Sequence, residues 1–269
     1  MLKTITHGAV TEIKVSRTIM RRPVYFNSFY YVDGLLIDTG PPHVAPEVAE
    51  LIRRLPIETA AITHQHEDHY GNCSLIQNKL GVPIYAHPGT LAVMAAPPKI
   101  QLYRKYMWGD AAPAAGLPLT KTIRTNRYCF EVIHTPGHSH DHVSFFEPDQ
   151  KWLFCGDFYL GEKLTGFMEG EDIADHLSSL EKIIKKEPLL LFCSLKGKLT
   201  DAVERLKRKH SYWWNLGVKI RQLYESGLSA NQIRRRLLEG ELPFYYLSQL
   251  NWGRKHLVDS FIKHRELFI

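Results

Sequence analysis

Hydrophobic and polar positions alternate in short runs through the first 200 residues, a pattern typical of strands joined by turns. The first 15 residues already alternate in this way. Residues 30–32 and 35–37 flank Asp33-Gly34, which predicts a two-residue hairpin. Further strands are predicted at residues 59–63, 82–86, 128–133, 142–146, 152–155 and 189–193. Helical spacing predicts helices over 46–54 and 173–186, and a Pro/Ala-rich loop is expected around 95–118.

The pattern changes after residue 200 and becomes helical. Residues 201–225 predict a long helix that Gly227 stops. Ser229 and Gln232 form a capping box that opens a second helix, which runs to about residue 238 and is closed by Gly240. Residues 257–267 predict a last amphipathic helix. We therefore expect two parts, a strand-rich catalytic domain at 1–200 and a helical C-terminal appendage at 201–269.

Composition and targeting signals narrow the class of protein. Hydrophobic residues make up 44% of the 269 residues and charged residues 23%, which excludes a disordered, collagen-like or coiled-coil chain. No apolar run reaches the roughly 20 residues that a membrane span needs, and the N-terminus lacks the apolar stretch of a signal peptide. The four cysteines form no CxxC pair. We expect a cytoplasmic protein with reduced thiols and no membrane contact.

The net charge of +6 is unevenly distributed. Residues 181–240 hold 14 Lys and Arg against 6 Asp and Glu, or +8, and the remainder carries −2. Such a basic segment is able to steer an anionic substrate or to contact nucleic acid. The simpler interpretation is a set of solvated helix faces, including residues 207–209 and 234–236.

Half of the 14 histidines fall in two short windows. In the first, residues 63–72, alternate residues of an extended segment place His64, His66 and Asp68 on one side, and His69 follows at the turn. In the second, residues 134–142, the pair Pro136-Gly137 forces a turn that aims His138 back over a strand end. Asp157, after Cys155-Gly156, follows a third strand. Because ligands of α/β proteins collect at strand carboxyl ends, we expect these donors to converge. Imidazole with carboxylate suits zinc, iron or manganese.

This ordered set of motifs resembles the metallo-β-lactamase-fold hydrolase superfamily, in particular its branch similar to hydroxyacylglutathione hydrolase. The resemblance rests on HxHxDH at 64–69, Pro-Gly-His at 136–138 and Gly-Asp at 156–157, and covers roughly residues 25–200. It implies a four-layer αββα sandwich with metals at the edge between the sheets. It also implies that His64, His66 and His138 hold a first metal, that Asp68 and His69 hold a second, and that Asp157 bridges both. The earlier Asp38 resembles the acid that supports the metal loop.

The sequence departs from the family at the usual last histidine ligand. The strand at 189–193 leads into Ser194-Leu195-Lys196-Gly197, so Leu195 or Lys196 takes the ligand position. Leucine has no donor atom and lysine is protonated at neutral pH, so neither replaces the histidine. We expect one or two ions, and Lys196 is a candidate to hold a substrate anion or stabilise an oxyanion.

The predicted chemistry is metal-dependent hydrolysis by a metal-bound hydroxide, with Asp68 orienting the nucleophile or acting as general base. An ester, thioester or lactone of a small molecule is the first substrate class, and that substrate could be anionic. Two alternatives stay open: a phosphodiesterase acting on nucleic acid, and a degenerate metal-binding scaffold. The appendage could cap the active site, shape the pocket or form a homodimer contact, and its sequence has no motif that decides among these.

Several other residues near these motifs have two interpretations. His134, with His140 and His142, is expected to support ligands or the structure rather than bind metal. Cys155 and Cys193 are expected to be small buried hydrophobes. The aromatic residues Tyr103, Tyr106 and Trp108 line a substrate pocket or belong to the core, and the sequence does not separate these alternatives.

Overall fold

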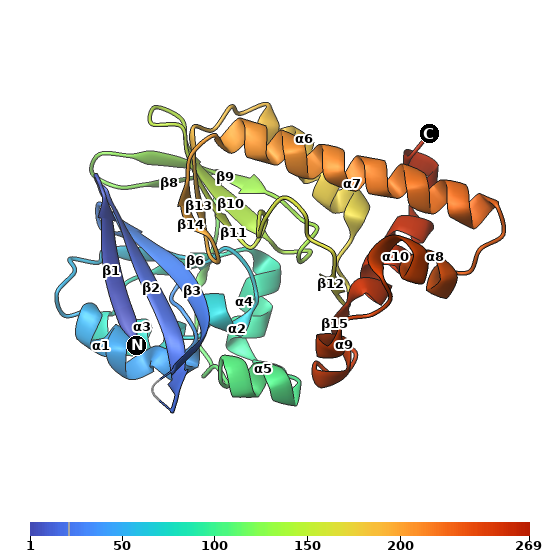
Figure 1. The fold of residues 1–269 in the computed structure, drawn as a ribbon. Coiled ribbons are helices and arrows are strands. Elements are labelled where there is room, and N and C mark those ends of the chain that lie inside the picture. The colour runs from blue at the N-terminus through green and yellow to red at the C-terminus, as the bar shows by residue number, and fades with distance from the viewer. Residues whose placement is uncertain (21) are drawn as a thin grey trace.

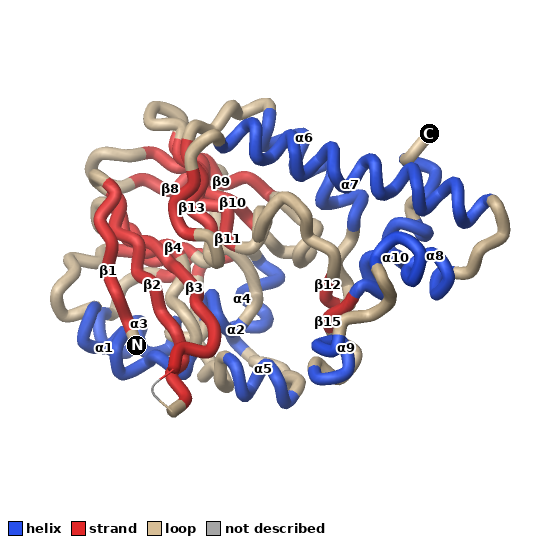
Figure 2. Tube along the Cα trace, in the orientation of Figure 1, coloured by secondary structure: helices blue, strands red, loops and turns tan. Residues whose placement is uncertain are grey.

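The computed structural model describes residues 1–20 and 22–269 and consists of two β-sheets packed face to face, with helices on both outer faces (Figure 1). The predicted αββα sandwich is confirmed. The C-terminal helices extend to one side of it, and α9 lies beside α5 at the lower edge of the view (Figures 1 and 2).

The first sheet has seven strands that follow one another in sequence order. Its first four strands are antiparallel, and β4 to β7 are parallel. The predicted hairpin is confirmed, because Val32 pairs with Leu35 around Asp33-Gly34, both of which have positive φ. The strands are β1 (Leu2–His7), β2 (Val10–Ile19), β3 (Arg22–Val32), β4 (Leu35–Ile37), β5 (Thr59–Ala61), β6 (Ile84–Ala86) and β7 (Leu117–Pro118).

The second sheet has six strands in the order β14-β13-β11-β10-β9-β8. Only the β11–β13 pair is parallel among the pairings described in this sheet. The strands are β8 (Thr122–Arg124), β9 (Cys129–His134), β10 (Val143–Glu147), β11 (Trp152–Gly156), β13 (Leu190–Cys193) and β14 (Gly197–Leu199). A two-stranded ribbon of β12 (Phe167–Met168) and β15 (Trp252–Gly253) ties the second half of the sandwich to the C-terminal segment.

Alternation along the strands separates the apolar side chains into three cores. Phe145 and Phe154 lie between the sheets, whereas their neighbours Phe146 and Leu153 face the outer helices. On the first sheet, Phe29 faces the outer helices and Tyr30 faces the space between the sheets. A continuous buried run such as β11 is therefore apolar on both faces, since each face packs against another layer.

Helices cover both outer faces. The first sheet is covered by helices from the 42–95 region, and the second by α6 and α7. In the first half the helices are η1 (Pro42–Val44), α1 (Ala45–Leu51), α2 (Glu67–Tyr70), α3 (Cys73–Leu80), α4 (Pro88–Ala95) and α5 (Leu102–Met107). In the second half they are α6 (Ile173–Ile184), α7 (Ala202–Glu225), α8 (Ala230–Leu238), α9 (Pro243–Leu247), α10 (Arg254–Lys263) and η2 (Arg265–Leu267).

One loop prediction was wrong. The expected loop at 95–118 contains α5 and the short strand β7. The helix is held by tertiary contacts, because the Arg104 guanidinium donates to the buried Glu67 carboxylate at 2.7 Å and Tyr103 Oη donates to Asn251 Oδ1 at 2.6 Å. Helix propensity alone does not stabilise so short a helix, so the sequence pattern does not reveal α5.

The C-terminal helices share a core with the second sheet. Leu206 and Trp213 of α7 pack in one buried cluster with Leu153 and Leu191 of the sheet. The predicted capping box is confirmed, since Ser229 and Gln232 cap α8 reciprocally. None of the helices in the described part of the chain combines the length and apolar character that crossing a membrane requires.

Candidate metal centre

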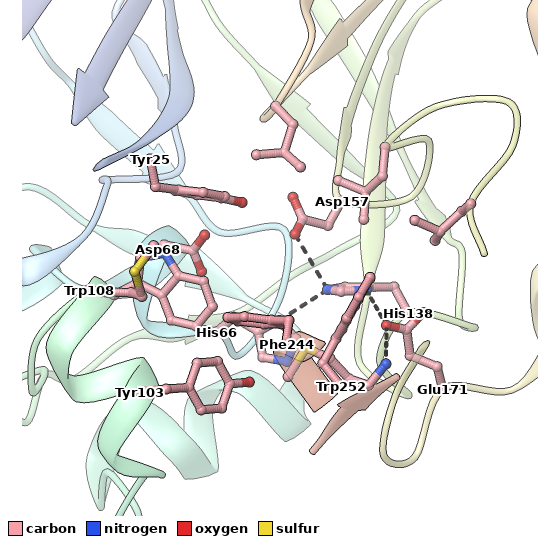
Figure 3. Close-up of a pocket in the computed structure, with 15 residues that line it drawn as sticks. Tyr25, His66, Asp68, Tyr103, Trp108, His138, Asp157, Glu171, Phe244 and Trp252 are labelled. Carbon is pink, nitrogen blue, oxygen red and sulfur yellow. Dashed lines mark hydrogen bonds and ion pairs between the residues drawn. The ribbon is translucent and has the colours of Figure 1, made fainter. Parts of the chain in front are cut away.

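Three segments that follow strand ends bring six histidines and acids to one place, and four of them are labelled in Figure 3. The first segment follows β5 and carries His64 and His66 in a loop and Asp68 and His69 on α2, so Asp68 is not part of the extended segment that the sequence predicted. The second segment follows β9 and carries His138, and the third follows β11 and carries Asp157. All three segments lie at the carboxyl ends of their strands. The arrangement of the sheets therefore brings residues that are far apart in sequence close together in space.

Asp157 is placed by an irregular strand end. The register between β11 and β13 shifts between Phe154 and Gly156, and Gly156 has a φ of 43°. A Cβ at position 156 would lie 2.8 Å from Thr63 Oγ1. The left-handed backbone and the close approach both require glycine, which explains the residue type that precedes Asp157.

The first group of donors consists of three imidazoles and one carboxylate. Nδ1 of His66 lies 2.9 Å from Nε2 of His64 and 3.0 Å from Nε2 of His138. Oδ2 of Asp157 lies 3.5 Å from His138 Nε2. The ligand atoms of the four residues lie within 4.8 Å of one another. Zinc–nitrogen bonds of about 2.0–2.1 Å would place tetrahedral ligands about 3.3 Å apart, so this spacing suits one ion.

The second group shares Asp157 with the first. Nε2 of His69 lies 3.2 Å from Asp157 Oδ1 and 3.8 Å from Asp68 Oδ2. The donors of Asp68, His69 and Asp157 again lie within 4.8 Å of one another. The structure thus brings all six residues together in two sets that meet at one carboxylate.

Three of the donors, His64, His66 and Asp157, already have the protonation state that a divalent cation needs. Burial above all holds the pKa of His64 and of His66 well below the usual histidine value, so both are neutral at pH 7. For Asp157, burial would raise the pKa, but the facing His69 and His138 outweigh it and hold that pKa well below its usual value. Burial lowers the pKa values of His138 and His69, but neighbouring carboxylates, led by Glu171 and Asp38 respectively, outweigh it and raise both, so metal binding would release protons from these two rings. Imidazole nitrogens beside an ionised carboxylate fit zinc, iron or manganese.

Two buried residues, Asp38 and Asn27, form hydrogen bonds with the donors of the second group on the side away from the cavity. Asp38, at a positive φ of 64°, accepts from Thr63 N at 2.8 Å and contacts His69 Nδ1 at 2.8 Å. Asn27 on β3 donates to Asp68 Oδ2 at 2.8 Å. Burial lowers the pKa of His69, yet the carboxylates led by Asp38 outweigh it and hold the pKa well above its usual value. Asp38 thus orients His69 so that Nε2 faces the cluster.

Sequence analysis did not identify three residues that contact the cluster. Glu171, before α6, lies 3.3 Å from His138 Nδ1 through its Oε1. Ser194 Oγ donates to Asp157 Oδ1. Tyr25 on β3 directs its hydroxyl toward Asp68 and Asp157 (Figure 3). None belongs to a histidine-rich window, and each reaches the cluster from a separate element, so no sequence spacing indicates them.

The position of the usual last ligand lies in a hairpin turn. Cys193 pairs with Gly197, so residues 194–196 form the turn between β13 and β14. Leu195 lines the cavity above the donors, whereas Lys196 is exposed and its side chain passes Gly161. The structure therefore places Leu195, and not Lys196, next to the reacting centre.

The remaining candidates divide between the site and its surroundings. His134 is exposed, stacks on His87 at 5.2 Å and contacts the His140 carbonyl oxygen at 2.8 Å, away from the donors. His142 is buried 5.0 Å from His64 between ring centroids. Tyr103 and Trp108 line the cavity, while Tyr106 is 53% exposed and does not. Cys155 and Cys193 are buried free thiols.

Comparison with known proteins gives consistent results. The family model "Metallo-beta-lactamase superfamily" matches residues 22–194. A beta-lactamase-like protein 2 homolog of Caenorhabditis elegans is 31% identical over 158 residues, covering 55% of this chain and 47% of that protein. A hydroxyacylglutathione hydrolase of Xylella fastidiosa (strain 9a5c) is 31% identical over 166 residues, covering 60% of this chain and 56% of that protein. The matched region spans about half the length of these curated relatives.

Solved structures support the same fold over nearly the whole chain. A beta-lactamase domain protein from Burkholderia ambifaria superposes with a TM-score of 0.72 at 17% identity, covering 97% of this chain and 89% of that one. A metallo-beta-lactamase family protein from Thermus thermophilus gives a TM-score of 0.66 at 17% identity, covering 96% of this chain and 93% of that one. At this identity the likeness concerns the fold, and it includes the C-terminal helices.

Proposed function

The chain belongs to the metallo-beta-lactamase superfamily, and from this premise we propose that it is a metal-dependent hydrolase of an ester, thioester or lactone bond in a small molecule. One observation carries the proposal: two groups of donor residues share Asp157 at the inner end of a cavity. The similarity to hydroxyacylglutathione hydrolase points to the same bond types. The four cysteines are free thiols, which agrees with a cytoplasmic location.

In this proposal each donor group holds one ion. His64, His66 and His138 would hold the first ion, Asp68 and His69 the second, and Asp157 would bind both. Zinc is the first choice, with iron or manganese as alternatives, since the donors suit all three. A bound ion would lower the pKa of a coordinated water to about 7 and polarise the scissile carbonyl.

Two side chains of this protein would act on the reacting atoms. Asp68, held by Asn27 Nδ2 at 2.8 Å, orients the attacking water, and with only the first group filled it accepts the proton that this water loses. Tyr25 donates a hydrogen bond to the oxygen on which negative charge develops. Burial, together with the Asp68 and Asp157 charges, raises the pKa of Tyr25 well above its usual value, so its hydroxyl keeps its proton at neutral pH.

The alternative of a nuclease receives less support from the surface charges. Part of the basic excess of residues 181–240 is already neutralised, because Arg208 pairs with Glu162 at 2.8 Å and Arg234 pairs with Glu241 at 3.2 Å. The cavity above the donors is lined mostly by apolar and aromatic side chains, which suits a small organic substrate better than a phosphodiester backbone.

Elemental analysis combined with a substrate panel tests the proposal. The gently purified protein should contain one or two equivalents of a transition metal, and it should hydrolyse members of an ester, thioester and lactone panel in preference to phosphodiesters. His64→Ala should lose both metal and activity, while His134→Ala, which changes an exposed histidine outside the cluster, should retain them. A wild-type protein that binds metal but hydrolyses no member of the panel would point instead to a metal-binding scaffold, and one that takes up no zinc, iron or manganese would overturn the proposal.

A further inference from the structure

The cavity above the donor cluster is walled by aromatic side chains from both halves of the chain. Its volume is about 320 Å³, within the range of small-molecule sites. Resting on the proposed hydrolase function, we infer that the substrate carries a bulky, uncharged apolar group, aromatic or hydrocarbon, beside its scissile carbonyl. We further infer that Phe244 and Trp252 of the C-terminal segment determine this specificity.

One wall of the cavity comes from the first half of the chain. Trp108, after α5, lies edge-on to Tyr25 at 6.0 Å and to Tyr103 at 6.2 Å between ring centroids. These three rings form a continuous surface from the mouth of the cavity to the donor cluster (Figure 3). Aromatic faces and edges of this kind contact hydrocarbon and aryl groups over a large area without a need for charge.

The opposite wall comes from the C-terminal segment. Phe244 on α9 meets the Tyr103 ring edge-on at 5.6 Å and the Trp252 ring at 5.8 Å. Two hydrogen bonds fix this segment against α5: Tyr103 Oη donates to Asn251 Oδ1 at 2.6 Å, and Leu102 N donates to Gln249 Oε1 at 2.8 Å. The two walls are therefore joined, and the C-terminal segment forms part of the binding site.

The charges that face the cavity argue against an anionic substrate group. Its charged lining groups are carboxylates and imidazoles, and none of its described lining residues is Lys or Arg. The nearby Arg104 is buried and donates a hydrogen bond to the Glu67 carboxylate at 2.7 Å, so its charge is already paired. Leu195 adds an apolar surface at the position of the usual last ligand. An anionic tail that lay against the aromatic walls, away from the donor cluster, would lose its hydration without gaining a cationic partner.

A series of 4-nitrophenyl esters from acetate to octanoate, with the negatively charged hemisuccinate as a comparison, tests the inference. Each buried methylene contributes about fourfold, so burial of half of the six methylenes that octanoate adds to acetate should already raise kcat/KM at least thirtyfold in the metal-loaded wild type. The hemisuccinate should be a poor substrate. Phe244→Ala and Trp252→Ala should each lower kcat/KM for octanoate tenfold or more and change that for acetate less than threefold. Tyr246→Ala is the matched control, since Tyr246 lies on the same helix and is 68% exposed outside the cavity.

Binding of 2-decanone, which has no scissile bond, gives a second measurement through quenching of tryptophan fluorescence. Trp252→Phe keeps an aromatic ring and should bind this ketone more tightly than Trp252→Ala, and the far-ultraviolet circular dichroism of each variant checks its folding. Hydrolysis with no chain-length preference, or a preference for the hemisuccinate, would overturn the inference and leave the hydrolase proposal intact. If no ester, thioester or lactone is hydrolysed, the hydrolase proposal fails, and decanone binding that is unchanged in Trp252→Ala and Phe244→Ala would overturn the inference as well.

Discussion

His138 Nδ1 lies 3.3 Å from the Oε1 atom of Glu171, on the side of the ring opposite the donor cluster. The second carboxylate oxygen of Glu171 contacts His176 Nε2 at 3.2 Å, so the carboxylate is held between two buried rings. Burial would raise the pKa of Glu171, but His138, followed by His176, outweighs it and lowers the pKa to about 2. An ionised Glu171 therefore fixes the tautomer of His138 that presents Nε2 to the cluster.

Glu171→Gln should weaken metal binding by roughly 10- to 100-fold, because partners of this kind orient the ligand and raise its basicity. Competition with a chromophoric chelator measures the affinity directly and is independent of turnover. Glu169→Gln removes an exposed carboxylate nearby and should leave the affinity unchanged. Equal affinity in the wild type and Glu171→Gln would show that His138 needs no partner.

Leu195→His should add a nitrogen ligand beside the second donor group and raise the metal content of a protein that binds fewer than two ions. Lys196→His places the same side chain one residue further along the β13–β14 turn, outside the cavity, and should have no such effect. Elemental analysis after dialysis against limiting zinc compares the two variants. A rise in the Lys196→His variant alone would mean that the turn presents residue 196 to the metals.

The donor residues were predictable because they stand close together in sequence at strand ends. His64 and His66 in the loop after β5 and Asp68 and His69 on α2 follow one strand within six residues, so a single strand assignment places all four near one strand end. Glu171 reaches the same point from a loop before α6, and it gives no spacing that a sequence pattern reveals.

The strands were predictable because alternation along a strand records which face is buried, whereas the four-layer sandwich was expected from the resemblance of the ordered motifs to the metallo-β-lactamase superfamily. Strands such as β11 pack on both faces and appear as short apolar runs. The short helices α5 and α9 were not predicted, because contacts between them hold both in place and neither is long enough to be stable by propensity. The aromatic walls of the cavity depend on these two helices, so the substrate pocket is the part of the site that sequence analysis could not define.

Asp172→Asn should destabilise the protein at neutral pH by about 1 kcal/mol, because the Asp172 carboxylate caps α6 and pairs with Lys263 Nζ at 2.9 Å and His264 Nε2 at 2.7 Å. Burial would raise the pKa of Asp172, but the hydrogen bonds from Lys263 and His264 outweigh it and lower the pKa to about 2, from about 3.8 in an unfolded chain. A carboxyl group whose pKa is lower in the folded protein than in the unfolded chain stabilises the folded state at pH values above the pKa of the unfolded chain. This contribution is lost as the pH falls toward 2. The difference in unfolding free energy between wild type and variant should thus have its full value at pH 6 and become smaller between pH 4 and pH 2.

Urea unfolding at several pH values measures that difference. Asp175→Asn is the matched control, because Asp175 is exposed on the same first turn of α6. A gap between wild type and Asp172→Asn that is constant from pH 6 to pH 2 would contradict the assignment of the effect to charge.

Gly217→Ala should destabilise the C-terminal helices even though alanine favours a helix over glycine by about 1 kcal/mol. A Cβ at position 217 would lie 2.4 Å from Phe268 Cδ1, and both residues are buried, so the ring has to move out of the core that α7 shares with the second sheet. Overpacking of this kind costs about 1–3 kcal/mol, which exceeds the gain in propensity. Asn215→Ala, exposed on the same helix, should be neutral or slightly stabilising. Thermal unfolding compares the two variants, and a Gly217→Ala protein that melts above the wild type would show that Phe268 is free to leave its place against α7.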